Sequence, residues 1–510
     1  MSNESITSKK TIGNIFKVAA SNILKLLAGV LVGFLLPKII GITDYGYYKT
    51  FTLYATYIGL FAFGITDGVY LKYGGKNYEE LDKSNFRFYT IFYFFLELIS
   101  SVVIALIAIL FLKDEIRYIF ICLAVFLIFN NITGYFQIIS QITGRFNELS
   151  IRTLIQSILT ALTVIGLWLV HRFSDNIITY RIYTIIYISI TAILALWYII
   201  TYRDITFGKQ GKRDWKDILE FVKIGFPLLI ANLCSSLILA LDRQFVSILF
   251  DTDTYAVYAF AYNMLGLITT ALSAISTVIY PTLKRTDENT LKSTYSRLIE
   301  IILILVFGCL LVYFPLCWFV NWFLPKYTDS LVIFRIILPG LAVSSVVTIV
   351  MHNYYKTFGK ETSFFIKSII VLVLSAGANY AAYAIFKTTQ AISIASIIVM
   401  VIWYVLIEIY FIRQHKVKWV KNFIYMLLVA AGFYLITWWD IWWASMLIYL
   451  VFFVGITYVF YWKDINVLMR KIFKKKIKED NTKENISEEI ASDTQTIEEN
   501  IQEDNKEDNL

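Results

Sequence analysis

The sequence predicts an all-α, polytopic membrane protein with about 14 transmembrane helices, and three observations lead to this fold class. Of the 510 residues, 58% are hydrophobic and only 16% are charged, whereas soluble domains carry about 25% charged residues. Apolar stretches long enough to cross ~30 Å of hydrocarbon as helices recur along nearly the whole chain. These stretches lack the polar/apolar alternation that strands of a membrane β-barrel require.

Each apolar stretch is expected to form one membrane-spanning helix. The expected spans are 14–40, 45–73, 87–112, 118–142, 151–170, 179–202, 221–250, 254–283, 297–323, 331–356, 363–386, 391–412, 420–438 and 442–462.

Lysine and arginine residues sort to one side of the membrane when the chain is threaded with its N-terminus inside. The cytoplasmic segments then hold 35 of the 46 lysine and arginine residues, while Lys25 and Arg243 lie within spans. The outer turns hold the other nine, which are Lys38, Lys49, Lys113, Arg117, Arg172, Arg181, Lys326, Arg335 and Lys387. An excess of basic residues marks the cytoplasmic side, so both termini are expected in the cytoplasm and the 437–445 turn outside.

An internal repeat divides the chain. At a shift of 210 residues, the polar positions of span 2 align with those of span 8: Tyr45, Tyr48, Thr52, Thr56, Gly59, Thr66 and Tyr70 match Tyr255, Tyr258, Tyr262, Gly266, Thr269, Ser276 and Tyr280. Spans 1–6 and 7–12 therefore read as two parallel copies of one six-helix unit, an architecture that places a transport site between the halves. Polar stripes of this kind also occur at helix–helix contacts, but their repetition favours a hydrated cavity wall.

The repeat predicts five parts of the chain. Residues 1–202 form a first lobe and residues 220–412 a second, joined by a cytoplasmic linker at 203–219 that is expected to lie in the membrane interface. Residues 413–463 add spans 13 and 14. Residues 464–510 form a basic and then acidic tail. From Glu479 onward the tail holds 12 acidic and two basic residues and no aromatic residue, so it is expected to be disordered.

Several segments resemble a known family. The stretch "IIGITDYGYYKTFTLYATYIGLFAFGITDG" (39–68) is similar to the first hairpin of bacterial polysaccharide flippases. Spans 7 and 8 resemble the equivalent helices of that family at Gly225, Pro227, Asp242, Arg243, Tyr258, Ala259, Tyr262 and Pro281, and "LPGLAVSS…YYKTFGKE" resembles span 10 and its exit loop. One departure is Ala256, where the family pattern has glycine.

The superfamily that this resemblance indicates joins multidrug exporters with flippases for lipid-linked oligosaccharides. The resemblance implies two lobes in a V, a cavity lined by spans 1, 2, 7 and 8, and alternating access. It also implies a location in the bacterial inner membrane and an undecaprenyl-diphosphate-linked sugar repeat as cargo. A polysaccharide polymerase and other assembly proteins are the partners expected in such a pathway, and nucleic acid is not.

Charged residues within spans are the main candidate site residues. A charge in the hydrocarbon core is costly, so such residues usually mark a functional site. Lys25 in span 1 and Arg243 in span 7 are expected to bind the diphosphate. Asp242 lies next to Arg243 and is expected either to bind cargo or to pair structurally. Other candidate substrate contacts are Asn22, Asn232, Tyr48, Tyr258 and Tyr262.

Other roles fall to the remaining polar and kink-forming positions. Asp67 and Asp242 are candidate sites for coupling to Na⁺ or H⁺, whereas Glu97 and Glu408 are interpreted as structural. Gly225 and Pro227 are a candidate hinge, because proline frees backbone carbonyls within a helix.

Two other function classes were weighed against the flippase. A cation-coupled exporter of small molecules needs a cavity centred on carboxylates, whereas cations are at least as prominent here. A membrane polymerase or ligase needs a large outer catalytic loop, and no outer turn exceeds about a dozen residues. The four cysteines form no CxxC pair, so neither a zinc site nor a disulfide framework is expected, and no cofactor is indicated.

Overall fold

The structure is a computed structural model that describes residues 24–173, 178–209, 211, 215–284, 286–415, 419–439 and 441–462. The described secondary structure is entirely helical, as predicted. The first half of the chain contains a helix at 24–39 and then α2 (Ile42–Ala55), η1 (Ile58–Ala62), α3 (Ile65–Tyr73), η2 (Tyr78–Glu80), α4 (Lys83–Phe111), α5 (Asp114–Ile142), α6 (Phe146–Phe173), α7 (Tyr180–Thr201) and α8 (Arg203–Thr206).

The second half is longer and more interrupted. It contains α9 (Trp215–Ile238), α10 (Leu241–Leu249), α11 (Thr252–Lys284), α12 (Glu288–Cys309), η3 (Leu310–Val312), α13 (Tyr313–Phe323), η4 (Pro325–Tyr327), α14 (Ser330–Ile337), α15 (Gly340–Ser345), the π-helical η5 (Val346–Met351), α16 (His352–Thr357), α17 (Glu361–Phe386), α18 (Thr389–His415), α19 (Val420–Ile436) and a last helix at Trp442–Trp462.

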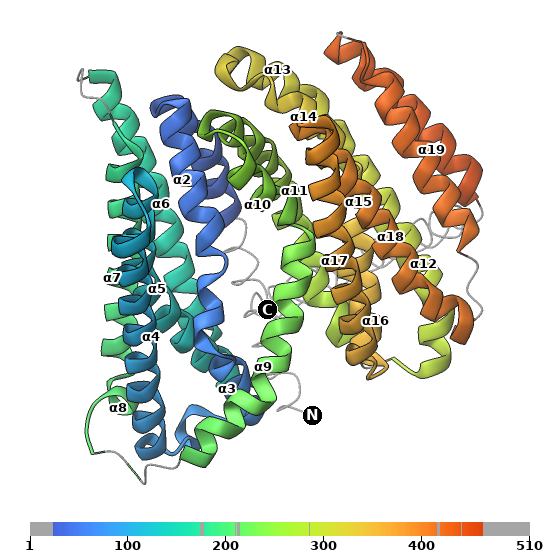
Figure 1. The fold of residues 1–510 in the computed structure, drawn as a ribbon. Helices are drawn as coiled ribbons and strands as arrows, with labels where there is room; N and C mark the ends of the chain where they lie inside the picture. The colour runs from blue at the N-terminus through green and yellow to red at the C-terminus, as the bar shows by residue number, and fades with distance from the viewer. Residues whose placement is uncertain are drawn as a thin grey trace, which may run out of the picture.

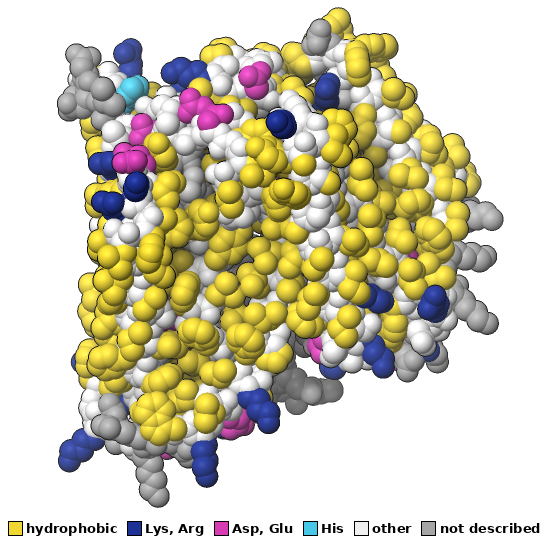
Figure 2. Space-filling view, in the orientation of Figure 1, with side chains coloured by type: hydrophobic (Ala, Val, Ile, Leu, Met, Phe, Trp, Pro, Cys, Tyr) yellow, Lys and Arg dark blue, Asp and Glu magenta, His cyan; other side chains and the backbone are white. Residues whose placement is uncertain are grey.

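Nine of the described helices are long and apolar enough to cross a membrane, and ten if the bent pair Ser330–Ile337 and Gly340–Thr357 is one span. The two helices of that pair meet at 45°, and Pro339 lies between them, as is common at kinks. The polytopic, all-helical class is therefore confirmed, while the full set of fourteen spans stays a prediction. Figure 2 shows apolar side chains covering the middle of one face, with charged groups gathered toward its two ends.

Two spans expected to be continuous are broken. Span 2 divides into α2, η1 and α3, and between η1 and α3 the residues Phe63 and Gly64 adopt left-handed backbone conformations, with φ of 48° and 78°. Span 7 divides at Leu239–Ala240 into α9 and α10, whereas α9 runs through Pro227 without interruption. Trp215, within the predicted linker at 203–219, is the first residue of α9.

The helices form two groups that α9 connects (Figure 1). In the first group α5 packs against α4 and α7, and in the second α17 packs against α18 and α11 against α14 and α16. The beginning of α9 packs against α3, and α9 also contacts α17 of the second group. Ile218 and Phe221 of α9 are buried in the same apolar cluster as Ile65 and Tyr89 of the first group.

The groups meet along α2 and α11, which pack side by side. Thr43 donates a hydrogen bond of 2.6 Å to Asp253, a residue 210 positions further on. This separation equals the shift of the sequence repeat, so positions that are equivalent in the repeat lie against each other. Gly46 permits the close approach, since a Cβ there would lie 2.5 Å from the Thr252 carbonyl oxygen.

Candidate functional site

A cavity of about 340 Å³ lies where α2, α10 and α11 meet the helix at 24–39. Its lining includes two cations, Lys49 of α2 and Arg243 of α10. The other lining residues are Gly29, Thr52, Leu53, Thr56, Tyr255, Ala259, Tyr262, Asn263, Gly266, Leu267 and Thr270. The two helices that carry the sequence repeat therefore supply most of this wall.

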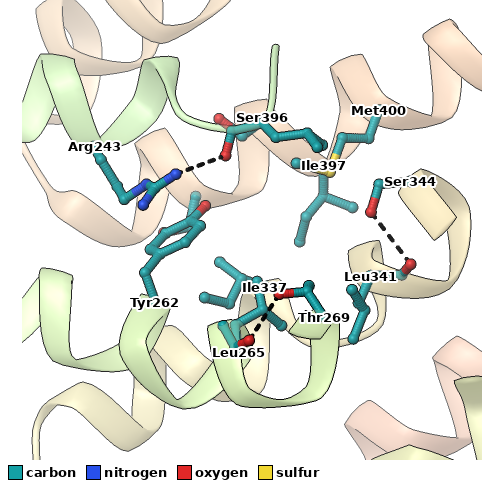
Figure 3. A pocket seen from close by; sticks show the side chains of 13 residues that line it. Arg243, Tyr262, Leu265, Thr269, Ile337, Leu341, Ser344, Ser396, Ile397 and Met400 are labelled. Carbon is teal, nitrogen blue, oxygen red and sulfur yellow. Dashed lines mark hydrogen bonds between the residues drawn. The ribbon is translucent and has the colours of Figure 1, made fainter. Parts of the chain in front are cut away.

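A second cavity of about 240 Å³ lies within the second group (Figure 3). It shares Arg243, Tyr262 and Gly266 with the first cavity, so the Arg243 side chain forms part of both walls. The remainder of its lining is mostly apolar and includes three serines. These other lining residues are Leu239, Leu265, Thr269, Ile337, Leu341, Ser344, Ser393, Ser396, Ile397 and Met400. No aspartate or glutamate lines either cavity, as far as the described residues extend.

The Arg243 side chain has spare donor capacity. Its guanidinium lies 4.8 Å from the Tyr262 ring centre, and one terminal nitrogen donates a long 3.5 Å hydrogen bond to the Leu239 carbonyl. Its Nε is buried and has no acceptor among the described atoms. A partly buried guanidinium with free N–H groups suits the binding of a phosphate-like anion, because Arg can bond two oxygens at once.

Asp242 lines neither cavity. Its side chain is 2% exposed, and its carboxylate accepts hydrogen bonds from Tyr258 at 2.8 Å, from Tyr262, and from the Arg243 backbone N–H at 2.7 Å. Ser393 of α18 in turn donates to the Tyr258 hydroxyl. The side chains of the doublet form no ion pair within the described part of the chain, as their separation by about 100° around the helix predicts.

Lys49 was not predicted as a site residue, and its assignment to an outer turn was wrong. It lies on α2, is half-buried, and donates a 3.2 Å hydrogen bond to Asn263 across the contact with α11. Its ammonium also lies over the Tyr45 ring at 5.1 Å. The sequence did contain a signal, since Lys49 stands inside a span and one helical turn from the polar positions Tyr45 and Thr52.

The remaining predicted cations and amides are more dispersed. Lys25 is exposed on the first described helix, one turn from Gly29, which lines the first cavity. Asn22 lies outside the described residues. Asn232 is exposed on α9, and Asp67 is half-buried in the first turn of α3. Neither Asn232 nor Asp67 lines the two cavities.

The tyrosine stripes divide between lining and packing. Tyr255 and Tyr262 line the first cavity, whereas Tyr48 packs edge-on against Tyr183 and Tyr258 binds Asp242. All four side chains are buried in the apolar core. The stripe therefore forms a cavity wall at some positions and a packing contact between helices at others.

Gly225 and Pro227 lie on the half of α9 that packs against α3. A Cβ on Gly225 would lie 2.0 Å from the Gly64 carbonyl oxygen and 2.4 Å from the Gly68 nitrogen, so only glycine fits between these helices. Pro227 is exposed beside this contact. No cluster of histidine, cysteine and acidic side chains that could hold a metal ion occurs in the described residues.

A helical bundle in two groups, with a basic cavity at the contact between them, is the architecture of a transporter rather than an enzyme, and known proteins bear this out. Residues 12–287 match the family described as "Polysaccharide biosynthesis protein", and the chain belongs to that family. The search of curated proteins found no match.

Solved structures establish the fold. The structure "Lipid II flippase MurJ, inward closed conformation" superposes with a TM-score of 0.67 and 16% identity, covering 89% of this chain and 100% of that one. An inward-facing multidrug resistance MATE family transporter of the MOP superfamily superposes with a TM-score of 0.56 and 15% identity, covering 78% of this chain and 94% of that one. A MOP superfamily transporter from Pyrococcus furiosus superposes with a TM-score of 0.51 and 14% identity, covering 79% of this chain and 96% of that one. The chain thus has the MOP superfamily fold.

Proposed function

We propose that the protein moves an undecaprenyl-diphosphate-linked oligosaccharide across the bacterial inner membrane by alternating access, for assembly of a cell-surface polysaccharide. The observation that carries this proposal is the pairing of Lys49 and Arg243 in one cavity whose described lining holds no acidic residue. Such a cavity attracts an anionic head group and repels the cationic compounds that a carboxylate-centred exporter would take. The O-antigen or capsule repeat is the class of cargo that this family membership supports.

The cavity supplies the contacts that the two parts of such a cargo need. Arg243 offers unpaired N–H groups to phosphate oxygens, and Lys49 adds a second positive charge from the opposite helix. Tyr255 and Tyr262 add aromatic surface to the same cavity, which suits sugars, while their hydroxyls donate to the Lys49 carbonyl and to Asp242. The polyprenyl chain would stay in the lipid. Lys25 lies one turn from the cavity and is proposed to contact the head group as cargo enters.

Asp242 is proposed to position the site rather than to bind cargo. Its hydrogen bonds from Tyr258 and Tyr262 fix one wall, and the same carboxylate fixes the backbone of Arg243. It remains a candidate for ion coupling, as does Asp67. Gly225 and Pro227 remain a candidate hinge. A polysaccharide polymerase is the proposed downstream partner.

The most direct test is deletion of the gene, followed by mass spectrometry of undecaprenyl-linked intermediates. We expect one complete, unpolymerised sugar repeat to accumulate on the lipid. Accumulation of a small amphiphile, with normal surface polysaccharide, would contradict the proposal and favour a multidrug exporter.

The distribution of basic residues predicts the topology. In a cysteine-free variant, a single cysteine at position 440 should react with a membrane-impermeant maleimide added to intact cells, and one at position 210 should react only after permeabilisation. Both positions lie outside the described residues. The reverse pattern would place the termini outside and invert the direction of every step above.

The acidic tail gives a second prediction. Residues 479–510 lack the apolar content needed to form a core, so removing them should leave export and protein abundance close to wild type. Surface polysaccharide can be quantified beside an immunoblot for abundance. Loss of export at normal abundance would show that the tail has a required partner.

A further inference from the structure

Glu97 is a buried carboxyl that the cavity chemistry does not use. It lies on α4 in the first group, and its side chain is 0% exposed. One carboxyl oxygen accepts a 2.8 Å hydrogen bond from the Asn131 amide of α5, while the other oxygen, Oε1, is buried without a partner. No lysine, arginine or histidine pairs with it within the described part of the chain. An isolated buried carboxylate is costly, so such a group is stabilised by taking up a positive charge.

The same amide joins Glu97 to the break in span 2. The Asn131 nitrogen also donates 3.0 Å to the carbonyl of Ile58, the first residue of η1. The Asn131 oxygen accepts from Asn130 at 3.4 Å, an arrangement that directs the amide N–H groups, rather than the oxygen, at Glu97 and Ile58. Because an N–H donor faces the carboxyl, the site fits a proton better than a metal cation, which needs oxygen ligands.

The break separates two parts of span 2 that contact different elements. On one side, α2 contributes Lys49 to the cavity and packs along α11, and on the other side α3 packs against α9. Any change that opens one of these contacts while keeping the other must alter the backbone between Thr56 and Gly64. A side chain that holds η1 is therefore placed to control that change.

We propose that Glu97, Asn131 and the Ile58 carbonyl form a proton-binding site that controls the break in span 2. A proton taken up on Oε1 removes the negative charge that strengthens the hydrogen bond from Asn131, and the neutral acid gains an O–H donor of its own. Asn131 then holds η1 less firmly, so protonation favours a different angle between α2 and α3. The inference rests on the proposed transport function only in what the proton would control during transport. Proton binding itself is measurable without cargo.

Few other titratable groups lie near this carboxyl. Tyr93 is its neighbour on α4, and Tyr135 of α5 stacks on Tyr93 at 5.0 Å. Asp67 of α3 also interacts electrostatically with Tyr93. The residues of η1, Ile58 to Ala62, do not titrate. Asp67 is the one acid in this group that needs its own control.

Infrared spectroscopy of the purified full-length protein in lipid nanodiscs tests the binding step. In a titration from about pH 5 to about pH 9, a range that spans the titration of buried glutamates, the carbonyl band of a protonated acid should appear as the pH falls. Glu97→Gln should remove that band. Glu408→Gln is the matched control, because Glu408 is 1% exposed but lies in the second group and bonds to Tyr295. Asp67→Asn should likewise leave the Glu97 band in place.

A spin label at position 63 tests the control of the break, since Phe63 is 44% exposed there. Its mobility should change with pH in the otherwise wild-type protein, should be fixed in Glu97→Gln, and should lose its pH response in Asn131→Leu. A band that survives Glu97→Gln would overturn the proton site. A label that still responds to pH in Glu97→Gln, or that responds to Na⁺ at constant pH, would overturn the proposed control. Neither failure would affect the cargo assignment, which the accumulating intermediate tests.

Discussion

Replacing Arg243 with glutamine should abolish or sharply reduce polysaccharide export while leaving protein abundance unchanged. Arg243 forms part of both cavity walls and has a buried Nε without an acceptor. Loss of a charge-assisted hydrogen bond costs about 1.5–3 kcal/mol, which corresponds to cargo binding about ten- to 150-fold weaker. Glutamine is polar and similar in shape to the first part of the arginine side chain, so it removes the guanidinium, including its contact with the Tyr262 ring, without leaving a large void.

A series at the same positions separates charge from shape. Arg243→Lys should be intermediate, because an ammonium keeps the charge and loses the planar fork. Lys49→Gln and Lys25→Gln should each reduce export, with the larger effect at Lys49, which lines the cavity. Lys113→Gln is the matched control, since Lys113 is an exposed cation at the start of α5 and outside both cavities.

The measurement is surface polysaccharide per molecule of transporter, together with the lipid-linked intermediate that accumulates. Normal export by both Arg243→Gln and Lys49→Gln would show that the cavity cations do not bind cargo. In that case Arg243 would be a packing partner of Tyr262, to which its guanidinium lies close.

The fold class was predictable because hydrocarbon imposes a simple length and polarity rule on each helix. Breaks within spans were harder to predict, because they depend on local backbone conformation. Proline at 227 suggested an interruption that the structure does not have, whereas the break in span 7 falls at Leu239–Ala240, where no proline or glycine stands. Both α9 and α10 pack against α17, whereas α10 also packs against α11, and such contacts between distant segments cannot be read from the local sequence.

The candidate site was predictable where a charge stood within a span, as at Arg243. The parts of the site that depend on the direction of a side chain were not predictable. Asp242 adjoins Arg243 in the sequence, yet it bonds to two tyrosines and lines neither cavity, because successive residues on a helix differ in direction by about 100°. Lys49 was missed because a lysine near the end of a span reads as a loop residue, and only the contact between α2 and α11 places it in a cavity wall.

The glycines at the contact of α3 and α9 give the prediction with the next largest effect. Replacing Gly225 with alanine would place a methyl group 2.0 Å from the Gly64 carbonyl oxygen, so the two helices must separate. Overpacking of this kind costs about 1–3 kcal/mol and would disfavour the docked arrangement by about five- to 150-fold. Under alternating access, a transporter that cannot populate one of its states loses transport, so Gly225→Ala should export poorly.

A chemical cross-link measures the docked arrangement directly. Lys72 of α3 forms ion pairs of 2.8 Å with Asp217 and with Glu220 of α9, so cysteines at positions 72 and 220 should cross-link with a short bifunctional reagent. Gly225→Ala should reduce that cross-link. Gly166→Ala on α6 is the control, because a Cβ there meets no atom within 4 Å, and alanine in a helix is slightly stabilising.

Gly46 provides the opposite perturbation and makes the test decisive. It lies at the other contact between the groups, where a Cβ would be 2.5 Å from the Thr252 carbonyl oxygen. Gly46→Ala should separate α2 from α11 and keep the cross-link between positions 72 and 220, whereas Gly225→Ala should lose it and keep the contact of Thr43 with Asp253. If the two alanine variants had the same effect on the cross-link, the contacts would open together, and the protein would not alternate between states closed at opposite ends.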